Sequence, residues 1–225
     1  MAALSFEYWT DPMCVWALIA QPRLERLLDH FRGQLAVQHK IVPVFGSFPQ
    51  RFAPGGSWAK AGIPGRVATT ARVAADNDFP QVTGEVWGEH NLTSSWAPSL
   101  AIKAVTDMES QGLCKPETSG LYTWRLREAF FIDERNITTR AVQLEVAEEL
   151  GLAREPIERR LDDGRAMALL WEDADERERK RIQGSPTYVF DGGRAMLFGN
   201  FDEGVLRGTV QALLENSAEG CSTCG

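Results

Sequence analysis

The chain has 225 residues, enough to bury a hydrophobic core in one large domain or in one domain that carries an insertion. Its 24 basic and 31 acidic residues give a net charge of −7 without any run of Lys or Arg, so nucleic acid and anionic membrane surfaces are not expected as partners. We see no signal peptide and no window near the roughly 20 apolar residues of a membrane helix, and therefore expect a cytoplasmic protein. In that compartment, four cysteines are more often catalytic, metal-binding or inert than paired in disulfides.

Strand and helix patterns alternate in the first part of the chain. Apolar and polar residues alternate over residues 4–9, which predicts a strand. Asp11 and Pro12 then signal a helix start, and apolar residues at helical spacing predict a helix over residues 15–31, ended by Gly33. A second strand is expected over residues 35–45. The Gly- and Pro-rich stretch 46–65 is interpreted as a surface loop.

The middle of the chain has helical spacing, and strand character returns near the end. Two strands, 187–190 and 195–198, are joined by the turn sequence Asp191-Gly192-Gly193. Residues 202–214 are expected to form a closing helix, followed by a small, polar, mobile tail over 215–225. Helices are predicted over residues 66–77, 95–111, 117–131, 138–150, 155–161 and 165–181.

The order of elements is β-α-β, a block of helices, then β-β-α, which indicates an α/β fold. The two chain ends would build one sheet, with the helical block inserted between them. We therefore predict one domain from residues 1–65 and 183–214, an all-helical insertion over 66–182, and a flexible tail over 215–225.

Cys14 is the strongest candidate for chemistry. It follows a strand and a helix-start signal, where backbone N–H groups and the helix dipole favour a thiolate. At such places a cysteine pKa can fall from about 8.5 to roughly 3.5–7.5, and the thiolate is the attacking species in disulfide exchange. We therefore expect Cys14 to be a partly exposed, acidic nucleophile; the alternative is a buried core cysteine. Trp16 is a candidate wall of an apolar cleft, and core packing is the alternative for it too.

The motif Asp11-Pro12-Met13-Cys14-Val15-Trp16-Ala17 resembles the active-site helix start of DsbA-like thiol oxidoreductases, which read D-P-x-C-x-W-C. Gly184-Ser185-Pro186-Thr187 resembles their cis-proline strand, and the segments 94–104 and 126–137 resemble their inserted helices. The resemblance extends to about Leu214 and implies a thioredoxin-like fold with a helical insertion. Relatives of this kind include FrnE-like proteins, kappa-class glutathione transferases, hydroxychromene-carboxylate isomerases and a protease adaptor.

The resemblance implies a set of site residues. Cys14 would be the catalytic nucleophile, and Asp11, Pro12, Trp16, Ser185 and Pro186 would bind the substrate or thiol. The backbone at Ser185 would pair with an extended substrate or a thiol cofactor. No tightly bound cofactor or metal is expected; the partner would be glutathione or another low-molecular-weight thiol, or a peptide or small-molecule thiol or disulfide, and a homodimer stays open.

Ala17 departs from the family pattern, because a second cysteine belongs at that position. Cys14 therefore has no local partner for a disulfide, and we predict an oxidoreductase of monothiol type. Two alternatives remain open: a kappa-type glutathione-dependent transferase or isomerase, in which Cys14 orients the glutathione thiolate, and a non-enzymatic protease adaptor that keeps the fold.

The remaining cysteines are weaker candidates. Cys221 and Cys224 form a second C-x-x-C in the tail, where they are either incidental thiols or resolving thiols for a mixed disulfide on Cys14. Cys114 is interpreted as structural or incidental.

Overall fold

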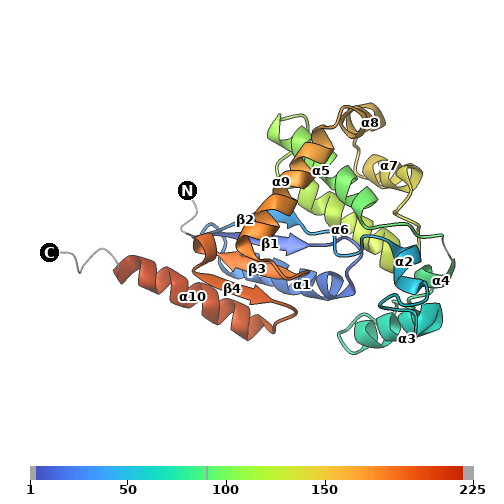
Figure 1. Ribbon diagram of the computed structural model, residues 1–225. Coiled ribbons are helices and arrows are strands. Elements are labelled where there is room, and N and C mark those ends of the chain that lie inside the picture. Colours follow the sequence, from blue (N-terminus) through green and yellow to red (C-terminus); the bar gives the residue numbers. More distant parts are fainter. Residues whose placement is uncertain (1–3, 90, 220–225) are drawn as a thin grey trace.

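A four-stranded sheet lies at the centre of the computed structural model, which describes residues 4–89 and 91–219. The strand order is β2-β1-β3-β4. β2 runs parallel to β1, whereas β3 is antiparallel both to β1 and to β4. The two chain ends therefore share one sheet, as predicted (Figure 1). The strands are β1 (Leu4–Thr10), β2 (Leu35–Ile41), β3 (Thr187–Phe190) and β4 (Ala195–Phe198).

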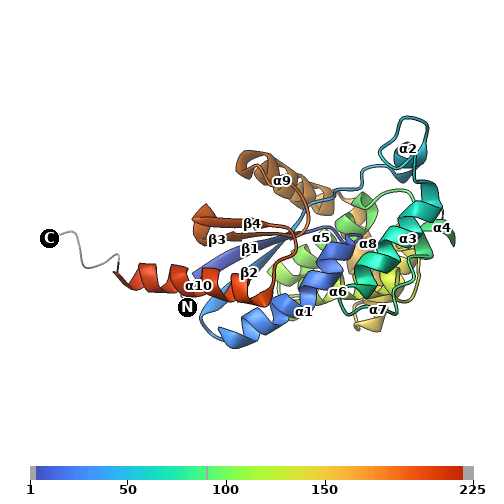
Figure 2. The same ribbon diagram turned by 90° about the horizontal axis from the view of Figure 1, so that it is seen from below.

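Helices cover both faces of the sheet (Figure 2). On one face lie α1 (Val15–His30) and α10 (Glu203–Glu219). On the other face lies α9 (Arg165–Lys180), whose buried Asp173 pairs with Lys40 of β2 at 3.3 Å and with Lys103. The core under α1 and α10 is built mainly from Leu4, Phe6, Tyr8, Leu24, Leu27, Phe31, Tyr188, Phe190, Leu206, Val210 and Leu213.

The inserted block is helical, and none of its described residues forms a strand. Its central helix, α5 (Trp96–Ser110), packs against α6, α8 and α9. The six helices predicted for this block are present, with ends shifted by a few residues. The other helices of the block are α3 (Gly62–Ala75), α4 (Val86–Glu89), α6 (Thr118–Phe131), α7 (Arg140–Glu149) and α8 (Arg154–Asp162).

The segment after β2 differs from the prediction. Strand β2 ends at Ile41 rather than at residue 45, and Pro43, just beyond it, has no N–H to continue a ladder. The stretch 46–65 is not all loop, because it contains α2 (Phe48–Phe52). Ser47 caps this helix by accepting a hydrogen bond from the Gln50 N–H at 3.4 Å. This serine cap was the signal that the sequence analysis missed.

The C-terminal boundary was also predicted wrongly. Residues 215–219 continue α10, so the flexible tail does not begin at residue 215; residues 220–225 lie outside the described part of the chain. The turn between β3 and β4 is a short 3-10 helix, Asp191–Gly193, in which Gly192 and Gly193 have φ of 66° and 105°. Glycine adopts such values without steric cost. Over the described residues, no helix is both long and apolar enough to cross a membrane.

The docking of α10 can be tested with two neighbouring residues. Leu206 is fully buried in the core beneath the sheet, whereas Val205 is 46% exposed. We expect Leu206→Ala to lower the free energy of unfolding by about 2–5 kcal/mol, because it leaves a cavity. Val205→Ala should change it by no more than about 0.5 kcal/mol. Urea denaturation measures both, and equal effects would mean that α10 is not docked as described.

Candidate functional site

The start of α1 places Cys14 at the end of β1. Cys14 is the N-cap residue, with extended φ and ψ of −91° and 116°, and α1 begins at Val15. Its N–H donates to the Asp11 carbonyl at 3.2 Å and closes a turn between strand and helix. Pro12 lies inside this turn, so the prediction that it occupies the first helical turn was wrong.

Asp11 holds this turn through its side chain. The carboxylate is fully buried and accepts hydrogen bonds from the Met13 N–H and the Val44 N–H, both at 2.7 Å. It also accepts one from the Ser95 hydroxyl at 2.6 Å. Burial raises the pKa of this carboxyl, and the hydrogen bonds from Ser95, Met13 and Val44 oppose that shift. Asp11 therefore holds the turn in place from within the core, and its side chain is not accessible to a substrate.

The loop before β3 completes the site. The Ser185–Pro186 peptide bond is cis. The Cys14 thiol lies 3.3 Å from the Ser185 carbonyl oxygen, to which it donates, and the Ser185 hydroxyl accepts a hydrogen bond from the Asp11 N–H at 2.9 Å. Residues 171 or more positions apart are thus in direct contact. The structure brings Cys14, Asp11 and Ser185 together as the sequence motifs predicted.

The thiol itself differs from the expectation. Cys14 is 6% exposed rather than open to solvent, and burial raises its pKa above the ordinary value. The Asp11 carboxylate raises it further. Hydrogen bonds from the Ser185 side chain and from the backbone of Ala17 and Trp16 oppose this, but they are weaker than the cost of burying a thiolate. The prediction of an acidic, partly exposed cysteine is therefore wrong for the protein in this state.

Two arginines near Cys14 were missed by the sequence analysis. Arg127 of α6 is 1% exposed and donates to the Thr10 hydroxyl at 2.8 Å, while its Nε has no hydrogen-bond partner among the described residues. Arg66 of α3 interacts electrostatically with Cys14. The available signal was its helical spacing: Arg127 lies three residues before Phe130 and four after Thr123, on the buried side of α6.

The accessible part of the site is small. Pro12 and Pro186 are buried, as is Ala17, whereas Ser185 is half-buried. Trp16 is 40% exposed on the first turn of α1 and is the apolar surface that a bound substrate would meet next to Cys14. Of the proposed binding residues, Trp16 and Ser185 are therefore the ones that a substrate can reach directly.

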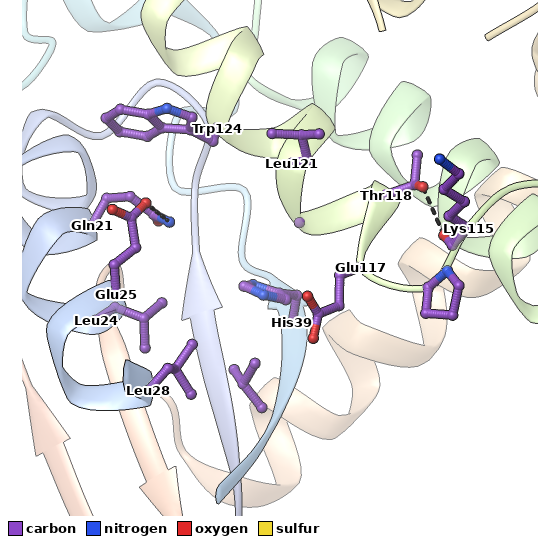
Figure 3. Close-up of a pocket in the computed structure, with 13 residues that line it drawn as sticks. Gln21, Leu24, Glu25, Leu28, His39, Lys115, Glu117, Thr118, Leu121 and Trp124 are labelled. Atoms are coloured by element: carbon purple, nitrogen blue, oxygen red, sulfur yellow. Dashed lines mark hydrogen bonds between the residues drawn. The ribbon is translucent and has the colours of Figure 1, made fainter. Parts of the chain in front are cut away.

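Two open pockets of the protein lie away from Cys14. One of about 420 Å³ is lined by α1, β2 and the start of α6, with His39 and Glu117 facing its interior (Figure 3). A second of about 540 Å³ is lined by His39 as well and by Cys114. Neither is lined by Cys14 or Ser185. A substrate of Cys14 would therefore bind on an open surface rather than in one of these cavities.

Three further polar residues, Cys114, His39 and Asn200, have surroundings of their own. Cys114 is half-buried beside α5 and α6, where burial raises its pKa. His39 is held neutral, because burial and the nearby Arg127 lower its pKa to about 4. Asn200 accepts a hydrogen bond from Arg23 of α1, which gives it a structural role. Cys221 and Cys224 lie outside the described residues.

Comparisons with known proteins agree with this geometry. A family model of DSBA-like thioredoxin domains matches residues 6–211. A Nitrosomonas europaea protein assigned as a protein disulfide isomerase superposes with a TM-score of 0.77 at 16% identity, over 95% of this chain and 98% of that one. The cytosolic disulfide reductase DsbM of Pseudomonas aeruginosa superposes with a TM-score of 0.66 at 20% identity, over 94% of this chain and 98% of that one. Its structure is also known with glutathione. A 2-hydroxychromene-2-carboxylate isomerase superposes with a TM-score of 0.62 at 15% identity, over 96% of this chain and 98% of that one.

A curated relative matches part of the chain. The ClpXP adapter protein SpxH of Halalkalibacterium halodurans is 33% identical over 107 residues. This region is 48% of this chain and 33% of the adapter, so the match spans about a third of that protein's length.

The protonation of Cys14 can be measured by its alkylation rate. Because the folded-state pKa is raised, Cys14 stays protonated where an unfolded thiol of pKa about 8.5 ionises. We expect the iodoacetamide rate at Cys14, assigned by mass spectrometry, to rise with a midpoint above pH 8.5. By linkage, the stability that this thiol contributes is present below about pH 8.5 and is lost as the pH rises towards the folded-state pKa. A midpoint well below 8.5 would contradict the buried, protonated thiol.

Proposed function

This chain belongs to the family of DSBA-like thioredoxin domains, and we propose that it is a thiol-disulfide oxidoreductase of monothiol type with Cys14 as its nucleophile. The observation that carries the proposal is the contact at 3.3 Å between the Cys14 sulfur, at a helix start, and the carbonyl that precedes Pro186. A sulfur held beside the half-buried Ser185 can, once it is a thiolate, attack a disulfide that pairs with the loop backbone. Trp16 supplies the apolar surface on the other side.

The reaction is a pair of exchanges. The Cys14 thiolate attacks one sulfur of a disulfide RS–SR′, the S–S bond breaks, RS stays on Cys14 as a mixed disulfide, and R′S⁻ leaves with the electron pair. A second thiolate, R″S⁻, then attacks the RS sulfur, forms RS–SR″ and releases the Cys14 thiolate. Ala17 has no sulfur, so the second thiol must come from outside the active-site helix.

We propose glutathione or a similar low-molecular-weight thiol as the second thiol, in a cytoplasmic setting that keeps such thiols reduced. Cys221 and Cys224 are the alternative. Helix α10 starts at the same end of the sheet as Cys14 and carries the chain away from it (Figure 1), over 17 residues or about 25 Å. These thiols would resolve the mixed disulfide from within the same molecule or, in a homodimer, from the partner.

A second candidate is a kappa-type transferase or isomerase. The favouring observation is the raised pKa of Cys14, because a protonated thiol can donate a hydrogen bond to the thiolate of a bound glutathione instead of attacking it. A third is an adaptor without catalysis, which the partial match to the SpxH adapter and the burial of Cys14 favour.

The adduct on Cys14 separates these candidates. After incubation with glutathione disulfide, we expect intact-mass and peptide mapping to find one glutathione on Cys14. The adduct should disappear in Cys14→Ser and persist in the matched control Cys114→Ser. Glutathione bound without a covalent bond would favour the kappa-type candidate. Neither binding nor adduct would favour the adaptor.

Replacing Ala17 by Cys should convert the monothiol mechanism into a dithiol mechanism, because it adds a second thiol to the active-site helix. The change creates C-x-x-C, so the new thiolate can attack the Cys14 sulfur of the mixed disulfide, form an intramolecular disulfide with it and release the substrate thiolate RS⁻. We expect insulin reduction, driven by dithiothreitol, to rise at least about tenfold over the natural protein. Ala17→Ser is the control of similar size. Because Ala17 is fully buried, melting curves must show that both variants fold, and equal activities of the two would contradict the proposal.

A further inference from the structure

Two arginines stack on one tryptophan close to the active site. The guanidinium carbons of Arg51 in α2 and Arg66 in α3 lie 4.9 and 4.5 Å from the ring centre of Trp58. Arg66 also lies 4.5 Å from the ring of Trp87, and both arginines lie over Phe45, at 5.3 and 5.7 Å. We call these five residues the arginine cluster. Aromatic stacking fixes the guanidinium planes and leaves their N–H edges for other partners.

This cluster adjoins Cys14. Phe45 and Trp87 belong to the same apolar core cluster as Cys14, and Trp58 packs against that cluster. Arg66 is close enough to Cys14 for a thiolate there to raise the arginine's pKa. Helices α1 and α3 also pack against each other, so a group bound to Arg66 would lie within electrostatic reach of the Cys14 sulfur.

The cluster has positive charge without a carboxylate partner among the described residues. Two other cations of low exposure do have one: Arg160 pairs with Asp107 at 2.6 Å, and Lys103 pairs with Asp173. The charged groups that shift the pKa of Arg66 are Cys14 and Arg51. Burial lowers this pKa to about 10, so the side chain stays charged at neutral pH, and its buried Nε has no hydrogen-bond partner in the described structure. Arg51 donates to the Val44 carbonyl at 2.5 Å and to the Ser57 hydroxyl at 3.4 Å, both uncharged.

We propose that Arg51 and Arg66 form an anion subsite that selects a thiol or disulfide bearing a carboxylate close to its sulfur. Arg51 and Arg66 are half-buried, and a cation that is partly removed from water without a carboxylate partner is costly; a carboxylate that binds its N–H edge offsets that cost. The planar guanidinium suits the two oxygens of a carboxylate, and partial burial strengthens the attraction. This inference rests on the proposed exchange at Cys14 and adds the chemical class of its substrate. The carboxylate can come from a small thiol or from an acidic residue beside a peptide cysteine.

Matched reagents of different charge test the subsite at Cys14. Iodoacetate and iodoacetamide differ in one negative charge, and the ratio of their rates at Cys14 does not depend on the fraction of thiolate. We expect the rate with iodoacetate divided by the rate with iodoacetamide to be at least about tenfold higher at Cys14 than for free N-acetylcysteine. A charge-assisted hydrogen bond to the carboxylate of iodoacetate predicts a difference of this size. Arg66→Gln and Arg51→Gln should each lower it towards the reference. Arg72→Gln removes the same charge from an exposed position of α3 and should leave it unchanged.

Disulfides of graded charge then identify the substrate. Mixed-disulfide formation should be fastest with dithiodipropionate, slower with bis(2-hydroxyethyl) disulfide and slowest with cystamine, and Arg66→Gln should remove this order. Peptide disulfides with Asp or Asn beside the cysteine show whether a peptide carboxylate also binds. If Arg66→Gln fails to fold, Arg51→Gln and Arg66→Lys carry the test.

The outcomes separate the two proposals. Similar rates for all three disulfides, with an alkylation ratio like that of N-acetylcysteine, would overturn the subsite and leave exchange at Cys14 intact. No mixed disulfide with any reagent, together with a high, Arg66-dependent alkylation ratio, would overturn the exchange and support the anion subsite by itself.

Discussion

The buried carboxylate of Asp11 is the interaction on which the site depends. It joins the turn before α1, the segment after β2 and the start of α5 through its bonds to Met13, Val44 and Ser95. The Asp11 N–H adds the loop before Pro186. Each of these donors is buried or half-buried, so losing its acceptor would cost about 1–3 kcal/mol. One side chain thus fixes the relative positions of the sheet, the inserted helices and the loop that faces Cys14.

The same carboxylate constrains the chemistry of Cys14. Its negative charge and the surrounding apolar core both disfavour a thiolate, and the N-terminus of α1 does not overcome them. Two cations oppose Asp11: Arg127 lies below the site, and Arg66 lies in the adjacent cluster. The site therefore keeps a closed, protonated thiol next to positive groups that would support the thiolate once the sulfur becomes reachable.

Periodicity in the sequence was sufficient to predict the sheet and the inserted helices, because each depends on a repeating apolar pattern that local residues carry. The motifs around Cys14 and Pro186 were sufficient to predict which residues meet. The environment of the thiol was not predictable in this way. Cys14 is part of a buried cluster that also contains Phe45, Phe48 and Trp87, which come from a stretch without a clear period. The arginine cluster likewise depends on α2, which a serine cap and five residues define.

The presence of two arginines, rather than one, is consistent with the charge changes of the proposed exchange. A thiolate at Cys14 and the carboxylate of a bound substrate would compete for a single cation, so binding the substrate would raise the pKa of the thiol further. With Arg51 and Arg66 both stacked on Trp58, one cation can hold the carboxylate while the other, Arg66, interacts with the sulfur. When the mixed disulfide forms, Cys14 loses its charge and Arg66 becomes free to bind the carboxylate as well. The negative charge near the cluster therefore falls by one in this step, because the leaving thiolate carries that charge away, and both cations can then hold the bound group in place for the second exchange.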